Sequence, residues 1–457
     1  MGTEMSRSFV IVATPFESVP VGGFLRDAKV LPYFSHALAE MSFEAVLHIP
    51  ANSIAASIML LVNSGMEFED AVRVVYRDAY KLRKLNLSTP LLEDSLCLGE
   101  ETAWRITHEG STLRKIRGFG PLYVRSIVEV EKKLVKRLIE FLSGKDVVFV
   151  YSMNESVEHF TVLYELCGGL RSSCGVMLQQ PLYRSVEFML SPRISPVISS
   201  IYLNSFIRKR FLDLVKRGYL KILLSVSPAP FLESEDLVYI AKRYGVKIAV
   251  PYPANAVDPE IFKYRSTNAD KPPIAVYFGR IYPGKGCFDL VEAWSTVEKE
   301  IPEAELWVIG SFASDRVKYE FFKNIKELKL RNVRYLGYIR HREKLYETVS
   351  KAKLLMYPSY EDAFPLTVLE ALALGLTVVA YDIPAIKYVY GGLKPVKIVG
   401  RGDVVSLARQ ALELLKADPE TLSSMLNDEQ TMEFIKLHSS WRNVALAEFK
   451  AIKAFLM

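Results

Sequence analysis

The sequence predicts an α/β fold built from two doubly wound domains that face a central cleft. Short runs of β-branched and other apolar residues alternate with helical stretches along the whole chain, which is typical of parallel sheets covered by helices. The length of 457 residues is more than one hydrophobic core usually serves. A connector punctuated by prolines, residues 251–259, separates two comparable sets of apolar runs.

Six apolar runs on each side of the connector are expected to form strands. Those before it are Phe9–Ala13, Ala45–Ile49, Asp146–Tyr151, Cys174–Leu178, Ile222–Val226 and Lys247–Val250. Those after it are Ile274–Phe278, Glu305–Ile309, Val333–Leu336, Leu354–Tyr357, Thr377–Tyr381 and Val396–Val399. Helices are expected between them, for example over Phe288–Glu300 and Leu366–Leu374.

The connector also sets the expected domain boundaries. We expect an N-terminal Rossmann-like domain over residues 1–255, a C-terminal Rossmann-like domain over residues 256–435, and a final helix over residues 436–457. Ligands of doubly wound folds bind at the carboxyl ends of strands, so the cleft between the domains is the expected site.

Composition and charge exclude several classes of protein. Half of the residues are hydrophobic and 24% are charged, a globular composition that excludes long-range disorder. The net charge of +6 is spread over both halves and forms no basic tail. The four cysteines lack the paired spacings of a zinc site or a disulfide framework. The apolar runs at residues 9–13 and 53–62 are too short to span a membrane, so we expect a cytoplasmic protein or one bound at the membrane surface.

A glycine-rich loop, residues 279–286, follows the first strand expected after the connector. It reads Gly-Arg-Ile-Tyr-Pro-Gly-Lys-Gly and leads into a helix. Glycines allow the backbone to approach a ligand, and Arg280 and Lys285 are cationic donors suited to a diphosphate. The spacing is neither that of a Walker A loop nor that of a dinucleotide fingerprint. The alternative is a plain turn that carries two solvated cations.

A second strand, loop and helix run from Tyr357 to Ala371. The main-chain N–H groups of Leu366 and Thr367 at the helix start can bind the same diphosphate. Asp362 lies in the loop and Glu370 eight positions later in the helix, so one carboxylate can accept hydrogen bonds from a sugar and the other from a ribose diol. The alternatives are that Asp362 caps the helix and that Glu370 is solvated, although the apolar neighbours of Glu370 make an unpartnered charge costly.

Together the two elements resemble those of a retaining glycosyltransferase of the family 4 type, which has the two-domain GT-B fold. The residues that carry the resemblance are Gly279-Arg280, Lys285-Gly286, Asp362, Glu370 and Ala373-Leu374-Gly375. The resemblance is close over about residues 250–400. Ser439-Ser440-Trp441 resembles the ending of this family, in which the C-terminal helix crosses back to the first domain.

The resemblance implies a hexosyltransferase that moves a sugar, with retention, from a nucleotide-diphosphate sugar in the C-terminal domain to an acceptor in the N-terminal domain. Arg280 and Lys285 would neutralise the leaving diphosphate in place of a metal ion, so no metal or other cofactor is expected. Glu370 would bind the ribose hydroxyls and Asp362 the hydroxyls of the donor sugar. Gly279 would belong to the donor site with the helix start.

Gly22 and Gly23 resemble the N-terminal glycine pair of the family, where the backbone approaches the donor phosphate and the acceptor. Two features depart from the family pattern. The first acid is usually a glutamate, and here it is Asp362 unless Glu361 serves instead. Many relatives carry a histidine near the donor sugar at the end of an N-terminal strand, whereas Ser152-Met153-Asn154-Glu155 follow one candidate strand here and Gln179-Gln180 follow another. A mechanism in which the departing phosphate takes the acceptor proton needs no histidine.

Two basic amphipathic stretches lie in the N-terminal half, residues 111–145 and 202–224. Such helices can lie in an anionic headgroup layer, which predicts a glycan or lipid-linked acceptor and peripheral contact with the membrane. The alternative is a solvated helix that packs on the sheet by its apolar side. Nucleic acid is not an expected partner, because no binding motif accompanies the charge.

Two other functions remain open from the sequence. A sugar-nucleotide epimerase has the same architecture but needs acid–base carboxylates and histidines. His159 lies in a helix-like segment downstream of a strand, and the other five histidines have no motif around them. They are expected to be ordinary core or surface side chains. A catalytically degenerate sugar-nucleotide-binding subunit would need a partner chain, and the intact Arg280, Lys285 and Glu370 argue against it.

Overall fold

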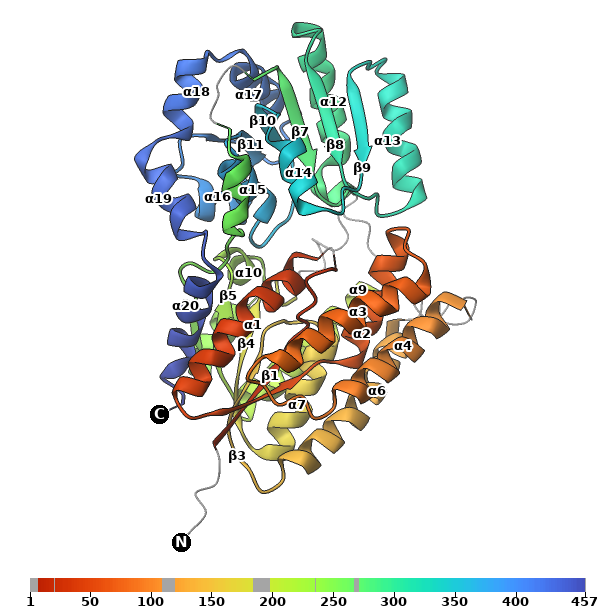
Figure 1. Cartoon of the computed structure of the whole chain (residues 1–457), viewed down its shortest axis with the longest axis vertical. Coiled ribbons are helices and arrows are strands. Elements are labelled where there is room, and N and C mark those ends of the chain that lie inside the picture. Colours follow the sequence, from red (N-terminus) through yellow and green to blue (C-terminus); the bar gives the residue numbers. More distant parts are fainter. Residues whose placement is uncertain are drawn as a thin grey trace.

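The computed structural model of the chain describes residues 7–19, 21–108, 120–183, 198–234, 236–266 and 271–456. Two six-stranded parallel sheets lie one above the other, each covered by helices (Figure 1). The predicted α/β class is therefore confirmed. Every predicted strand is present, with bounds that shift by at most two residues.

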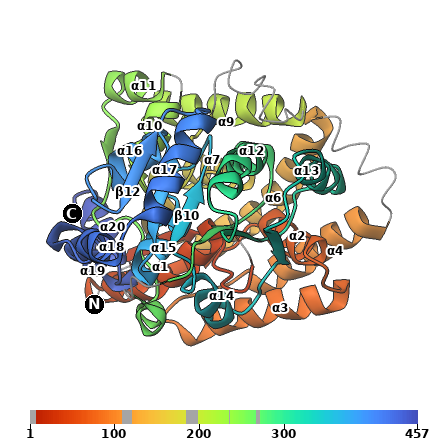
Figure 2. The same ribbon diagram turned by 90° about the horizontal axis from the view of Figure 1, so that it is seen from above.

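The first sheet has the strand order β2-β1-β3-β4-β5-β6. Its strands are β1 (Arg7–Val12), β2 (Glu44–His48), β3 (Asp146–Ser152), β4 (Ser173–Leu178), β5 (Leu220–Ser225) and β6 (Lys247–Ala249). Its helices are α1 (Gly22–Glu40), α2 (Ala51–Asn63), α3 (Phe68–Lys81), η1 (Leu82–Lys84), α4 (Leu92–His108), α6 (Gly120–Leu142), α7 (Val157–Leu170), α9 (Ile198–Lys216), α10 (Ala229–Glu233) and α11 (Leu237–Arg243). Seen from above, α9 and α3 lie on opposite sides of the molecule, so helices cover both faces of this sheet (Figure 2).

The second sheet has the order β12-β11-β10-β7-β8-β9. Its strands are β7 (Ile274–Phe278), β8 (Glu305–Ile309), β9 (Val333–Gly337), β10 (Leu354–Tyr357), β11 (Thr377–Tyr381) and β12 (Val396–Val399). The elements between and after them are η2 (Pro259–Tyr264), η3 (Pro283–Lys285), α12 (Cys287–Glu300), α13 (Asp315–Glu327), α14 (Arg342–Val349), α15 (Leu366–Leu374), α16 (Pro384–Tyr390), α17 (Val404–Lys416), α18 (Pro419–Leu426), α19 (Glu429–Leu437) and α20 (Trp441–Lys453).

The central strands of the second sheet are buried over their whole length. Every residue of β7, β10 and β11 is buried, because helices cover both faces of the second sheet. A strand buried on both faces is apolar without alternation, which is why these runs could be recognised in the sequence. The segment between β6 and β7 contains the predicted connector and joins the two sheets.

The C-terminal helix α20 returns to the first sheet, as predicted. It runs beside α1 at the lower end of the molecule (Figure 1). Glu448 of α20 forms a fully buried ion pair with Arg26 of α1 and accepts a hydrogen bond from the hydroxyl of Tyr151 at 2.6 Å. The ring of Phe449 meets that of Phe34 edge to face, with centroids 5.6 Å apart. The last helix is thus part of the core of the N-terminal half.

Candidate functional site

The topology of the second sheet brings the two predicted motifs together. Strand order reverses between β7 and β10, which are adjacent in the sheet although they are far apart in the sequence. The loops that follow two such strands diverge and leave a crevice at their carboxyl ends, where doubly wound folds bind ligands. The glycine-rich loop follows β7, and the loop with Asp362 follows β10. Both motifs therefore lie at the expected ligand crevice of this half.

Glycine is required at two positions of the first loop. Gly279 has φ of +141°, a conformation that L side chains rarely adopt. Gly286 has φ of +70°, and a Cβ atom there would lie 1.9 Å from the main-chain oxygen of Pro358 in the second loop. The two loops are therefore in close backbone contact. The alternative of an ordinary turn does not explain that contact.

Lys285 joins the two loops through its ammonium group. The Nζ atom lies 2.6 Å from Oδ2 of Asp362 and 2.8 Å from the main-chain oxygen of Glu361. The hydroxyl of Tyr357 also donates to Oδ2 of Asp362, at 2.5 Å. Arg280 is exposed, and its guanidinium carbon is 5.7 Å from the ring centroid of Tyr282. One predicted cation is thus paired with the predicted acid, and the other faces solvent.

Glu361 and Asp362 have different surroundings. Glu361 is buried, and its Oε1 accepts a hydrogen bond from the hydroxyl of Tyr282 at 2.9 Å. The Asp362 side chain is about one fifth exposed and contacts Lys285. Pro365, not Asp362, occupies the N-cap position of α15. Of the two acids that the sequence left open, Asp362 is therefore the one beside Lys285, and its interpretation as a helix cap is wrong.

The start of α15 faces both the first loop and the N-terminal half. A Cβ atom at Gly279 would lie 3.9 Å from Oγ1 of Thr367, and one at Gly22 would lie 3.6 Å from Cδ1 of Leu366. The first N–H groups of a helix have no partner within the helix. Candidate residues from three distant segments are thus assembled at one end of α15.

Glu370 is buried inside this helix, with 7% of its surface exposed. Its Oε1 accepts hydrogen bonds from Nη2 of Arg342 at 3.1 Å and from the hydroxyl of Tyr346 at 3.2 Å. Burial raises the pKa of Glu370, and the charge of Arg342 opposes that rise. The alternative of a solvated Glu370 is therefore wrong. Arg342 and Tyr346 lie four residues apart and thus on one face of α14, and no motif in the sequence marks them as partners of Glu370.

In the N-terminal half, Gln179 lies beside the glycine pair. A Cβ atom at Gly23 would lie 2.8 Å from Oε1 of Gln179. The Nε2 group of Gln179 donates to Oδ1 of Asp27 and to the main-chain oxygen of Met153, both at 2.8 Å. Gln180 is exposed. A glutamine with a fixed side-chain orientation thus lies beside the glycine pair.

Two buried carboxyl groups surround Gln179. Burial raises the pKa of Asp27 to about 7 and that of Glu155, which accepts the Gln179 main-chain N–H, to about 8. Burial also lowers the pKa of His48 to about 4 and that of His159 to about 3. These two histidines are neutral core side chains, as expected.

The raised pKa of Asp27 predicts a pH-dependent effect of Asp27→Asn on stability. Between about pH 4 and pH 7 the folded protein holds this proton while the unfolded chain has lost it, so Asp27 lowers the free energy of unfolding by up to about 1.4 kcal/mol per pH unit. Asparagine has no such titration. The stability of the variant relative to wild type should therefore rise with pH and level off above about pH 7. Urea unfolding at several pH values measures this.

The control is Asp146→Asn at the exposed start of β3. Its stability relative to wild type should change less with pH than that of Asp27→Asn. If the stability curves of wild type and Asp27→Asn were parallel from pH 5 to pH 8, the buried, protonated state of Asp27 would be wrong.

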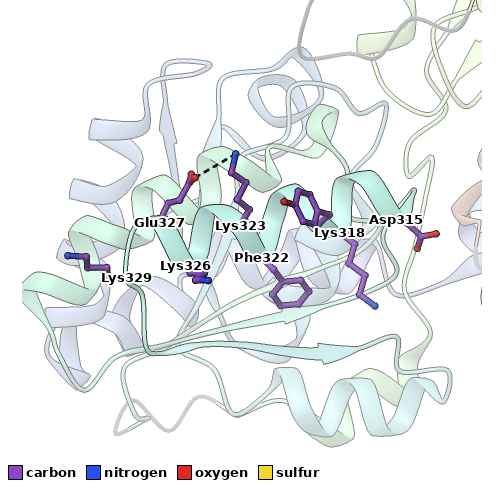
Figure 3. A pocket seen from close by; sticks show the side chains of 8 residues that line it. Asp315, Lys318, Phe322, Lys323, Lys326, Glu327 and Lys329 are labelled. Carbon is purple, nitrogen blue, oxygen red and sulfur yellow. Dashed lines mark ion pairs between the residues drawn. The ribbon is translucent and has the colours of Figure 1, made fainter.

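Two cavities are found in the described part of the chain, the second of them beside Phe364 of the second loop. One, of about 860 Å³, follows the exposed face of α13 and is lined by Tyr319, Phe322 and several lysines (Figure 3). The other, of about 630 Å³, lies between the two halves, with Ser227 on one side and His438 on the other. Neither is lined by the candidate residues of the two loops.

Part of the first basic stretch, residues 111–119, lies outside the described residues. Most of the rest falls in α6, where Lys132 pairs with Glu165. In the second stretch, the guanidinium carbon of Arg210 lies 3.9 Å from the ring centroid of Tyr164. These contacts agree with helices that pack on the protein. Among the helices that the structure describes, none combines the length and apolarity needed to cross a membrane.

Comparison with known proteins links residues 259–429 to one family, whose model is described as glycosyl transferases group 1. An α-1,3-N-acetylgalactosaminyltransferase of Campylobacter jejuni, which is named for a diphospho-undecaprenol substrate, is 27% identical over 207 residues, or 43% of this chain and 50% of that protein. The poly(glycerol-phosphate) α-glucosyltransferase of Bacillus subtilis is 34% identical over 158 residues, or 34% of this chain and 21% of that protein. The matches thus span half or less of these relatives.

Solved structures match over nearly the whole chain. Anabaena Alr3699/HepE in complex with UDP has a TM-score of 0.62 at 12% identity, over 98% of this chain and 100% of that one. Sucrose-phosphate synthase of Thermosynechococcus elongatus has a TM-score of 0.63 at 16% identity, over 98% of both chains. These likenesses confirm the GT-B fold. Residues 259–429 thus match the group 1 glycosyl transferases in sequence, and the whole chain has the fold of the solved structures.

Proposed function

We propose that the chain is a metal-independent, retaining glycosyltransferase that uses a nucleoside diphosphate sugar. The observation that carries the proposal is the arrangement at the end of β7 and β10. Two cations, Arg280 and Lys285, stand on one loop, and the start of α15, whose first N–H groups have no partner within the helix, lies close to that loop. Cations and helix N–H groups that converge on one crevice suit a diphosphate.

In this proposal the residues of the site stabilise charge rather than form covalent bonds. As the bond between the anomeric carbon and the diphosphate breaks, an acceptor oxygen bonds to the same face of that carbon, and the acceptor proton passes to the departing phosphate oxygen. Arg280 and Lys285 stabilise the negative charge that develops on the leaving group. Before the donor binds, Asp362 neutralises Lys285, so the diphosphate replaces a carboxylate as the partner of the ammonium.

The same proposal assigns the remaining contacts. Glu370 accepts hydrogen bonds from the ribose diol, and Asp362 accepts them from hydroxyls of the donor sugar once Lys285 turns to the diphosphate. The backbone at Gly22 and Gly23 closes the site from the N-terminal half, where it meets Leu366 and Gln179. Sugar and acceptor would then meet between the two halves.

We further propose a lipid-linked or polymeric acceptor at the cytoplasmic face of a membrane. Two observations support this proposal, the acceptors and products for which the relatives are named and the positive charge of one helix. The relatives are named for a diphospho-undecaprenol substrate, for poly(glycerol-phosphate) and, in Streptococcus pneumoniae, for an α-galactosylglucosyldiacylglycerol product. The cationic helix α9 would provide the contact with anionic headgroups.

A thermal-shift screen of the purified protein with UDP, GDP, ADP and their sugar conjugates tests the proposed donor. A ligand that binds only the folded state adds about 2.7 kcal/mol of stability at one hundred times its Kd. We expect one nucleotide family to raise the Tm of the wild type, with UDP tested first because HepE binds it. The shift should be lost in Lys285→Ala. If no nucleotide raised the Tm of the wild type, the proposal would fail.

A further inference from the structure

The carboxylate of Glu370 is held on one oxygen only. Both of its recorded contacts, from Arg342 and Tyr346, go to Oε1. Among the described residues, no partner is recorded for Oε2, although the side chain is only 9% exposed. Oε2 is not among the fully buried side-chain atoms that lack a partner, so this oxygen is accessible and can accept a hydrogen bond from a ligand at the carboxyl end of the sheet.

The Arg342 guanidinium divides its contacts between this carboxylate and the segment that joins the two halves. Its Nη2 lies 3.1 Å from Oε1 of Glu370, and its Nη1 lies 3.5 Å from Oδ2 of Asp258. The other oxygen of Asp258 accepts a hydrogen bond from Nε1 of Trp441 at 2.9 Å and lies 3.3 Å from Nζ of Lys29. Both terminal nitrogens of the Arg342 guanidinium are therefore held by carboxylates, Nη1 by Asp258 and Nη2 by Glu370.

We infer that Arg342 is a positioning residue for donor binding: with Tyr346 it holds Oε1 of Glu370, so that Oε2 accepts the hydrogen bonds of the ribose diol. The second arm of its guanidinium anchors this arrangement to Asp258. The inference rests on the proposed function, because it concerns the nucleotide that this site would bind. It assigns to Arg342 a role that no feature of the glycine-rich loop or of the acidic motif provides.

The charge of Arg342 also favours the carboxylate form of Glu370. Burial raises the pKa of Glu370, and Arg342 and the Tyr346 hydroxyl oppose that rise. The other groups that face this carboxylate are Asp258 of the connector, which adds to the rise, and Tyr390 of α16. Without Arg342 more of the Glu370 carboxyl is protonated at neutral pH. A protonated carboxyl is a weaker acceptor for a diol than a carboxylate.

The test measures how strongly each variant prefers a ribonucleotide over its 2′-deoxy form. Calorimetry at pH 6 to 9 gives the Kd of UDP, GDP and ADP and of their 2′-deoxy forms for wild type, Arg342→Gln and Arg342→Lys. We expect wild type to prefer one ribonucleotide about tenfold at all pH values. The preference should fall towards one in Arg342→Gln at pH 7, recover as the pH rises, and be partly retained in Arg342→Lys.

Matched variants separate positioning from general damage. Arg340→Gln removes an exposed arginine two residues away and should behave as wild type. Tyr346→Phe removes the second donor to Oε1 and should lower the preference by a smaller factor than Arg342→Gln, which keeps the test informative if that variant fails to fold.

Two results would overturn the inference. One is an unchanged preference in Arg342→Gln, and the other is an equal loss of affinity for both nucleotide forms at every pH, which a merely structural arginine would produce. If the wild type bound a nucleotide without any preference for the ribose form, the inference would fail while the proposed donor class stood. If the wild type bound no nucleotide, the proposed function itself would fail.

Discussion

Lys285→Ala is expected to lower the rate of sugar transfer by about 10²–10³-fold while the protein remains folded. That is the usual effect of removing one charge-stabilising donor from a transition state. Lys285 is about one fifth exposed, and the partner that its loss leaves behind, Asp362, is exposed to the same extent and can be hydrated. The rate should be measured at a saturating donor concentration, with the Tm of each variant as the check on folding.

The matched control is Lys323→Ala. This lysine is exposed on α13, beside the cavity of Figure 3, and pairs with Glu327 within its own helix. Its removal takes the same charge from the same half of the protein and should leave the rate unchanged. Equal rates for wild type and Lys285→Ala would refute the assignment of Lys285 to the leaving group.

Glu448→Ala is expected to lower the free energy of unfolding by about 3–5 kcal/mol, the usual cost of removing one partner of a buried ion pair. Arg26 and Glu448 have no exposed side-chain surface, and Nη1 of Arg26 already lacks a hydrogen-bond partner within the described part of the chain. The substitution would leave the Arg26 charge unpaired in the core and the Tyr151 hydroxyl without its acceptor. Urea unfolding of the whole chain measures the difference.

Lys450→Ala, on the exposed face of the same helix, is the control and should change the stability by less than about 0.5 kcal/mol. The double variant Arg26→Met, Glu448→Leu should recover most of the loss, because well-packed apolar side chains can replace a buried ion pair. A single variant as stable as Lys450→Ala would show that the ion pair contributes nothing to the attachment of α20.

The sequence allowed the strands and the two loops to be predicted because their signals are local. A strand buried on both faces is a short apolar run, and β7 and β11 are read directly in this way. The burial of Glu370 could be expected for a related reason, since its immediate neighbours in α15 are apolar. Only the need for a partner was predictable, and not the identity of that partner.

The contacts that complete the site are long-range and had no local signal. Arg342 reaches Glu370 across 28 positions, from a helix that follows a different strand. Gln179 reaches Asp27 across 152 positions, and Arg26 reaches Glu448 across 422. Each pair depends on how the sheets and the last helix pack. The choice between Glu361 and Asp362 depended in the same way on Tyr282, whose hydroxyl binds the first of them.

The polypeptide passes between the two halves twice, once before η2 and once before α20. The two passages are joined to each other, because the N–H of Val257 donates to the main-chain oxygen of His438 at 2.9 Å. Two bodies attached at adjacent points can swing about the line through those points, but twisting against each other would strain both attachments. Any widening of the crevice is thus restricted to a rotation about one axis. A protease cut in one passage leaves the halves connected through the other.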